Sequence, residues 1–137
     1  YELSNGERRV RVSSEGKESK TQWNVQERFM HATLVHASPL SGRTHQIRAH
    51  MKAIGHPIFN DEDYGGDNII YMNFGGNFKQ FISNSFKICQ RQALHAKNLG
   101  FIHPKNNEEI FFDSNLPADL AELIEKFRAY TNAYNIL

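Results

Sequence analysis

GRTHQIRAH, residues 42–50, is the stretch of sequence that decides the fold around it. A hydroxyl at Ser41 or Thr44 can cap a helix here, because it can accept a hydrogen bond from the unpaired amides of the first turn. Apolar residues then recur at helical spacing along one face: Ile47, Met51 and Ile54. Gly55, two residues before Pro57, predicts the end of the helix. We therefore expect one short amphipathic helix.

Arg48 lies beside this apolar face, and His45 and Lys52 fall on the same side of the predicted helix. An arginine at the margin of a core is partly desolvated, so its charge requires a carboxylate or phosphate partner. The alternative is an ordinary solvated face, which is the commoner arrangement for such side chains. Arg48 is nevertheless the best candidate for a functional residue.

The length and composition are those of one domain without a membrane segment. At 137 residues the chain can bury roughly two-thirds of its unfolded surface, and no apolar run approaches the roughly 20 residues of a membrane helix. The lone Cys89 excludes an internal disulfide and a cysteine zinc site, which fits a reducing, cytoplasmic setting. The charge is net basic over residues 1–56 and net acidic over residues 57–137, which suggests a polyanion-facing first part.

Two neighbouring strands are predicted before the central helix. Residues 21–29 place Trp23 and Val25 inward in a half-buried strand, and residues 32–37 form the next strand. Strands this close in sequence should pair antiparallel. Residues 8–12 alternate charge and valine, which is typical of an exposed edge strand; their arginines either protect that edge or contact phosphate.

The second half of the chain predicts a covering helix, a hairpin and a final helix. Residues 67–90 hold phenylalanines at near-helical spacing, and beyond covering a sheet the role of this segment is open. Residues 94–103 predict a strand that turns near Asn107, which tolerates positive φ, and returns as residues 109–113. The last helix carries an apolar stripe: Leu120, Leu123, Ile124 and Phe127. We expect an α+β fold with a mainly antiparallel, mixed sheet flanked by helices.

Seven histidines invite a metal hypothesis, but their spacing does not support one. No His-x-x-x-His pair or His-Glu-x-x-His motif occurs, and no cysteine cluster assists them. A serine hydrolase would need a Gly-x-Ser-x-Gly elbow, and phosphate-loop and dinucleotide-binding patterns are missing as well. We therefore expect no metal site.

The central motif also resembles the signature of a known enzyme family. The blocks that carry the resemblance are, in chain order, GRTHQIRAH at 42–50, IGHPI at 54–58, Asp61, Tyr64-Gly65, LHA at 94–96 and LGFIHP at 99–104. In this order, and over nearly the whole chain, they resemble the ribosomal RNA pseudouridine synthases of the RluA/RluC/RluD class.

The resemblance implies a cofactor-free isomerisation, in which the uracil of an RNA uridine is detached from its ribose and rejoined through carbon. The family's essential aspartate lies in an Arg-Leu-Asp motif, which this sequence lacks. Since the chain also begins at Tyr1 rather than Met, we expect residues 1–137 to be the C-terminal half of a pseudouridine synthase catalytic domain. The missing N-terminal half would be a partner, and residues 1–137 alone would be inactive.

The resemblance further implies roles for particular residues. Arg48 would pair with the aspartate that lies upstream, and Leu94 would form a wall of the uracil pocket. The pocket rim, able to hold the phosphate or ribose of a flipped-out nucleotide, would comprise Arg43, Thr44, His45 and Gln46. These rim roles have plainer alternatives: helix capping for the hydroxyl and a loop hydrogen bond for the histidine. We expect Asp61 and Tyr64 to brace the pocket.

Ribosomal RNA is the substrate that the resemblance favours, with transfer RNA as the alternative. The rival interpretation is a non-catalytic RNA-binding or ribosome-assembly module, because the chain lacks the nucleophile. An Arg-Leu-Asp motif upstream would discriminate between the two. Half of a catalytic sheet should also leave an apolar strand edge unpaired, so we expect an exposed hydrophobic patch or self-association.

Overall fold

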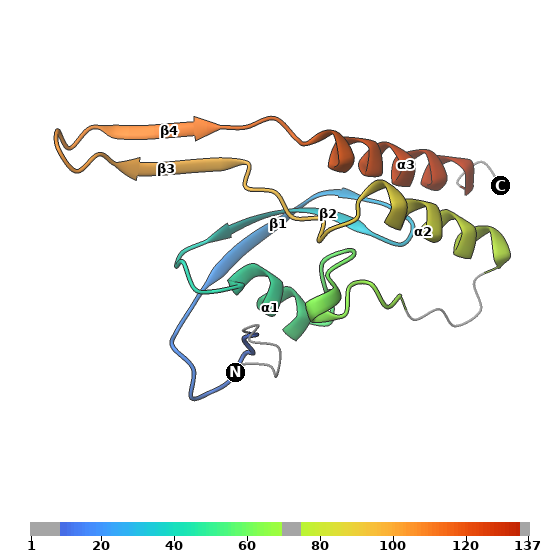
Figure 1. The fold of residues 1–137 in the computed structure, drawn as a ribbon, viewed down its shortest axis with the longest axis horizontal. Coiled ribbons are helices and arrows are strands. Elements are labelled where there is room, and N and C mark those ends of the chain that lie inside the picture. The colour runs from blue at the N-terminus through green and yellow to red at the C-terminus, as the bar shows by residue number, and fades with distance from the viewer. Residues whose placement is uncertain (1–8, 70–74, 135–137) are drawn as a thin grey trace.

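The structure, a computed structural model, describes residues 9–69 and 75–134. In chain order its elements are β1 (Thr21–Arg28), β2 (Thr33–Pro39), α1 (Gln46–Ala53), the 3₁₀ turn η1 (Glu62–Tyr64), α2 (Gly76–Ile88), β3 (Asn98–Ile102), β4 (Glu109–Asp113) and α3 (Ala118–Tyr134). The predicted α+β class is confirmed. Helices α2 and α3 lie side by side at one end of the molecule, and the β3–β4 hairpin occupies the other end (Figure 1). No described helix has the length and apolar character that a membrane span requires.

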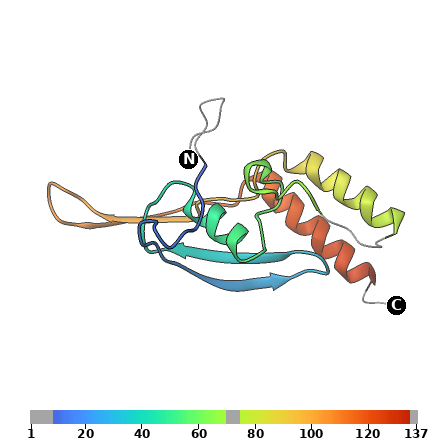
Figure 2. The same ribbon diagram turned by 90° about the horizontal axis from the view of Figure 1, so that it is seen from below.

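Strands β1 and β2 pair antiparallel, as predicted, from Thr21 opposite Pro39 to Arg28 opposite Thr33. A register shift between Val25 and Glu27 bends the pair. Helix α1 packs against both strands of this pair and lies on the β2 side of them in Figure 2. The expected antiparallel sheet therefore consists, in the described residues, of two separate two-stranded pairs, β1–β2 and β3–β4.

Trp23 is 54% exposed, so the prediction that it points into a core is wrong for the described residues. Trp23 nevertheless lies on the sheet face that turns toward α1, because alternate residues of a strand share a face and Thr21 contacts α1. Helix α1 has only eight residues and reaches β1 at the Thr21 end. The face toward α1 is therefore only partly covered.

Helix α1 begins and ends differently from its sequence pattern. Its N-cap is His45, in the left-handed region at φ 51°, with no side-chain cap, so the expected cap by Ser41 or Thr44 is wrong. Gly55, at φ 81°, ends the helix as predicted. There the amide of His56 donates to Met51 O at 2.9 Å and the Gly55 amide to Lys52 O at 3.0 Å, the Schellman arrangement.

The buried face of α1 is also rotated from the expected one. Its buried residues are Gln46, Ala49 and Met51, whereas Ile54 is 52% exposed. A polar residue, Gln46, is buried at the start of this face, because it finds hydrogen-bond partners for its whole side-chain amide, as described below. The apolar stripe predicted this helix correctly but not the side on which it packs.

The main core lies between α2 and α3. Its buried members are Phe78, Ile82, Cys89, Leu120, Leu123 and Phe127. Aromatic rings connect the two helices: Phe81 meets Phe127 edge-on at 5.0 Å between centroids and stacks on Tyr130 at 4.2 Å. The predicted apolar stripe of the last helix is thus confirmed, and residues 76–88 pack mainly against α3 rather than over a sheet. Residues 70–74 of the segment whose role was left open lie outside the described residues.

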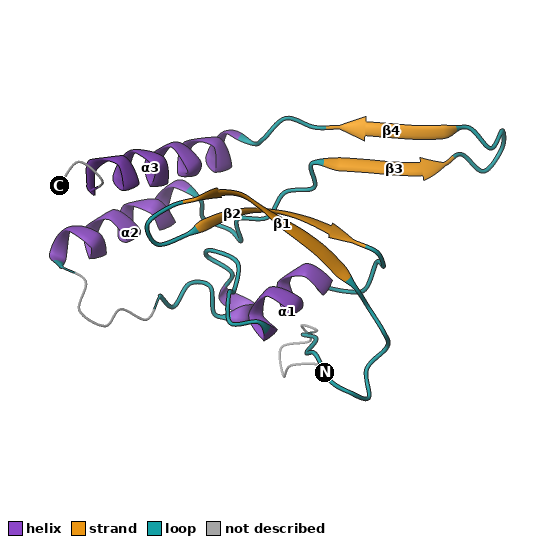
Figure 3. Cartoon of the chain, turned by 180° about the vertical axis from the view of Figure 1, so that it is seen from behind, coloured by secondary structure: helices purple, strands orange, loops and turns teal. Residues whose placement is uncertain are grey.

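The β3–β4 hairpin follows its sequence pattern and exposes apolar side chains. Asn107 takes φ 55° in the turn, as predicted. The strand expected over residues 94–103 is shorter and begins at Asn98. Large exposed side chains gather on the hairpin: Leu99, Phe101, Ile102, Phe111 and Phe112. Seen from behind, the hairpin extends away from the helices, with no other described element beside it (Figure 3).

Residues 9–12 form no strand, contrary to the edge strand expected at 8–12; residue 8 lies outside the described residues. Side chains rather than a strand ladder hold this segment. The amide of Val10 donates to the Tyr64 hydroxyl at 3.1 Å, and the Arg9 guanidinium pairs with Asp63 at 2.9 Å. The segment therefore crosses over the η1 turn.

Candidate functional site

Arg48 holds two carboxylates of the segment that follows α1. Its Nε and Nη2 donate to the two oxygens of Asp61 at 2.8 and 2.6 Å, and Nη2 also donates to Asp63 at 2.6 Å. The Arg48 side chain is 11% exposed and that of Asp61 is 0% exposed. This two-pronged geometry is the strongest form of an arginine–carboxylate contact. The sequence implied a carboxylate or phosphate partner for Arg48, and within the described chain two carboxylates fill that role.

The charges around this pair balance. The Arg48 hydrogen bond lowers the pKa of the Asp63 carboxyl, and Arg9 adds to the effect. The hydrogen bonds that Arg48 donates to Asp61 raise the pKa of the Arg48 guanidinium. The guanidinium carbon also lies 4.9 Å from the centre of the Tyr64 ring, which favours the cation. Two arginines and two aspartates therefore form one compact network.

A tight backbone turn presents Asp61 to Arg48. The Gly66 amide donates to Asp61 O at 2.7 Å, and the Asn60 amide donates to Gly66 O at 2.9 Å. A Cβ at residue 66 would lie 1.7 Å from Ile58 O, so only glycine fits there. This turn was expected to brace a pocket, and the structure gives its carboxylate a definite partner.

Gln46 forms the second organising point, and its side-chain amide is saturated. Its Oε1 accepts from Ser41 Oγ at 2.7 Å and from the Arg43 amide at 3.2 Å. Its Nε2 donates to Lys20 O and to Thr21 Oγ1, both at 3.0 Å. The amide of a glutamine can make about four such bonds. At 6% exposure, Gln46 therefore joins the loop before α1 to the start of β1.

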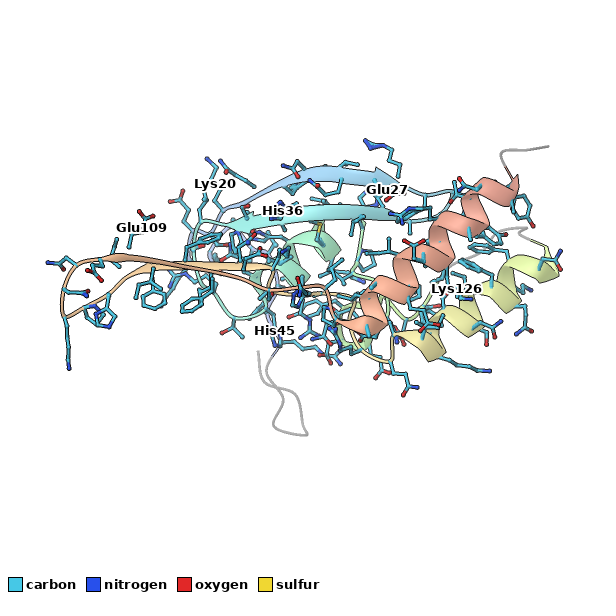
Figure 4. All side chains as sticks on the ribbon, turned by 90° about the horizontal axis from the view of Figure 1, so that it is seen from above. Lys20, Glu27, His36, His45, Glu109 and Lys126 are labelled. Carbon is cyan, nitrogen blue, oxygen red and sulfur yellow. The ribbon has the colours of Figure 1, made fainter. Side chains whose placement is uncertain are left out.

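His45 and Tyr64 connect the two organising points. The His45 Nδ1 lies 3.1 Å from the Tyr64 hydroxyl, and the rings meet edge-on. The Val10 amide already donates to the Tyr64 hydroxyl, so the proton of that hydroxyl is available to the imidazole. His45 lies on the side of the molecule away from Lys20 and His36 (Figure 4).

The remaining candidates are more loosely placed. Arg43 and Thr44 are exposed on the loop before α1, and within the described part of the chain Arg43 makes no ion pair. Leu94 is half-buried in the segment before β3, where its carbonyl accepts from Arg91 Nη1 at 2.9 Å. The structure thus groups Arg43 to Arg48 on one short segment, while Leu94 belongs to another.

Sequence reasoning missed the roles of Arg9 and Asp63. Arg9 lies in the segment expected to be an edge strand, and Asp63 lies between Asp61 and Tyr64, of which only a bracing role was expected. The available signal was the run of acidic residues at 61–63, because carboxylates placed shortly after a partly buried arginine are its natural partners. No group of three metal-ligating side chains occurs among residues 9–69 and 75–134.

Comparison with known proteins connects this geometry to a family. Over 127 residues the chain is 42% identical to the ribosomal large subunit pseudouridine synthase C of Haemophilus influenzae. The matched region makes up 93% of this chain and 36% of that protein. The chain is a relative of the pseudouridine synthases. The ribosomal large subunit pseudouridine synthase C of Escherichia coli K12 is 40% identical to the chain over 126 residues, which make up 92% of the chain and 37% of that protein. The resemblance drawn from the sequence is confirmed.

A solved structure agrees at the level of the fold. The human RNA pseudouridylate synthase domain containing 4 superposes with a TM-score of 0.56, at 23% identity, over 93% of this chain and 50% of that one. No protein-family model matches this pseudouridine synthase relative. The chain spans little more than a third of the curated relatives' length.

Proposed function

We propose that this chain is part of an RNA pseudouridine synthase, an isomerase that acts on uridine in large-subunit ribosomal RNA. The observation that carries the proposal is 42% identity, over 93% of the chain, with a ribosomal large subunit pseudouridine synthase C. The basic first part of the sequence is in keeping with an RNA substrate. Cofactor-free chemistry requires only side chains, a base-binding pocket and phosphate contacts.

We also propose that residues 1–137 form the C-terminal half of a catalytic domain whose remainder supplies the aspartate. The sequence contains no Arg-Leu-Asp, and about two-thirds of each curated relative lies outside the matched region. The exposed apolar hairpin side chains, of which Phe111 is 67% exposed, support a docking surface for that remainder. Strand β3 carries no charged residue or proline, so its outer edge is open to a further strand.

In this proposal the loop before α1 meets the RNA backbone. Arg43 is exposed and has no ion pair within the described residues, so its guanidinium can bind a phosphate. Thr44 lies beside it and is exposed as well, and His45 keeps Nε2 for a ligand because Nδ1 faces Tyr64. Leu94 is assigned to the uracil wall by family resemblance alone.

The pairing of Arg48 with an aspartate from another segment stays a prediction with a definite geometric requirement. Arg48 already uses Nε and Nη2 on Asp61 and Asp63, so a further carboxylate would have to use Nη1. Arg43 offers an uncommitted guanidinium for the same task. Comparing Arg48→Lys with Arg43→Lys under single-turnover conditions distinguishes them, because the arginine that holds the catalytic acid loses rate rather than RNA affinity.

A reconstitution experiment tests the proposed function. Residues 1–137 are assayed for tritium release from RNA containing [5-³H]uridine, alone and together with a polypeptide that carries the Arg-Leu-Asp half of the domain. We expect no release from residues 1–137 alone and release from the mixture. Turnover by residues 1–137 alone would contradict the assignment of roles. RNA binding with no turnover in either sample would favour the non-catalytic RNA-binding module.

A further inference from the structure

The saturated amide of Gln46 is incompatible with the rim role that its motif suggests. All four hydrogen-bonding positions of the amide are taken by protein groups, and the residue is 6% exposed. A direct contact with substrate would have to break one of these bonds in a buried site, which is unfavourable. Gln46 can therefore influence a ligand only through the protein groups that its side-chain amide binds.

We propose that Gln46 is a positioning residue that presents Arg43 to an RNA phosphate; this inference rests on the function proposed above. The two residues are joined in both directions. The backbone amide of Arg43 donates to Gln46 Oε1 at 3.2 Å, and the backbone amide of Gln46 donates to the Arg43 carbonyl at 3.1 Å. These two bonds close a small ring that includes the backbone of the residue carrying the exposed guanidinium.

The ring is anchored to the sheet, so it sets the position of Arg43 relative to the whole domain. Gln46 Nε2 donates to Lys20 O, and the same carbonyl accepts from the Leu40 amide at 2.8 Å. Lys20 and Leu40 flank the paired ends of β1 and β2. The loop that bears Arg43 is therefore bonded, through one glutamine, to the end of the β1–β2 pair.

The loop needs such an anchor because its own backbone is not self-supporting. A Cβ added at Gly42 would have no atom within 4 Å, so the surroundings do not confine this residue. His45 occupies the left-handed region at φ 51°, which is uncommon for residues other than glycine. Without Gln46 the loop would sample several conformations, and binding would then have to order Arg43.

The inference is tested by a double-mutant cycle on binding of a uridine-containing single-stranded RNA oligonucleotide. Four proteins are compared: the unaltered protein, Gln46→Met, Arg43→Ala and the double variant. Arg43→Ala should weaken binding on the order of tenfold and make the negative slope of log K against log salt less steep by about 0.7, the share of one phosphate contact. Gln46→Met should also weaken binding and make the salt slope less steep. The double variant should bind no more weakly than Arg43→Ala.

The salt slope separates positioning from a loss of fold, because partial unfolding lowers the bound fraction without removing a phosphate contact. Ser41→Ala removes only one bond to Gln46 Oε1, so it gives a milder second variant, and its effect should vanish in the Arg43→Ala background. Gln80→Met, on the exposed face of α2, is the matched control and should change nothing.

Two different failures are distinguishable. If Arg43→Ala leaves RNA affinity unchanged, the proposed function of the loop fails. If Arg43→Ala weakens binding but Gln46→Met and Ser41→Ala do not, or if their effects add fully to that of Arg43→Ala, the positioning role of Gln46 is overturned while the RNA-binding function stands.

Discussion

Replacing Arg48 by methionine should lower the free energy of unfolding more than any substitution of an exposed side chain. Methionine retains the apolar stem of the side chain but removes the guanidinium that holds Asp61 and Asp63. The Asp61 side chain is 0% exposed and would be left as a buried carboxylate without its cation. The perturbation therefore tests whether the network is structural.

The expected size follows from the burial of the two partners. Removing one partner of a buried ion pair costs about 3–5 kcal/mol, because the remaining charge is left uncompensated. For a domain of this length, that corresponds to a fall of roughly 10–20 °C in Tm. Arg48→Lys keeps the charge but can replace only one of the two contacts to Asp61, so about 2 kcal/mol is expected.

Urea unfolding followed by circular dichroism measures these differences directly. Lys52→Ala, one turn further along α1 and exposed, is the control and should stay within about 0.5 kcal/mol of the unaltered protein. An Arg48→Met protein as stable as the Lys52→Ala control would refute the reasoning. It would mean that the carboxylates find other partners or water once the guanidinium is gone.

Three further outcomes follow from the geometry. Gly66→Ala should cost about 3 kcal/mol or more in urea unfolding, because its Cβ would meet the Ile58 carbonyl, whereas Gly42→Ala has open space and should cost little. Since the pKa of Asp63 is lowered in the folded state, its stabilisation is complete above about pH 4 and is lost as the pH falls further; Asp63→Asn should flatten unfolding free energy measured from pH 6 to pH 2. Phe111→Asp should reduce self-association in light scattering at high concentration while leaving Tm unchanged, and unaltered association would remove the hairpin from the interface.

Local patterns in the sequence were sufficient for much of the fold. The spacing of apolar residues predicted α1 and α3, and the short separation of two apolar runs predicted the antiparallel β1–β2 pair. Asn107 was assigned positive φ because asparagine tolerates it, and it adopts φ 55°. These features depend on neighbours a few residues away, which periodicity and turn chemistry describe well.

Features that depend on distant partners were not predictable in the same way. The rotation of α1 is decided by hydrogen bonds from Gln46 to residues about 25 positions earlier in the chain, which no helical spacing reveals. The exposure of Trp23 depends on how far α1 extends over the sheet. The sequence predicted that Arg48 needs a carboxylate or phosphate partner, but only the tertiary turn at Gly66 determines that Asp61 supplies it.

The motif at residues 42–50 therefore combines two kinds of residue that a sequence match cannot separate. A helix advances 100° per residue, so Gln46 and Ala49 turn toward the sheet while Arg48 turns toward the following acidic segment. Arg43 precedes the helix and stays at the surface. Identity across such a motif is consistent with direct contact at the exposed positions and with support at the buried ones. The buried positions can still govern binding, because the exposed guanidinium is only as well placed as the amide that holds its loop.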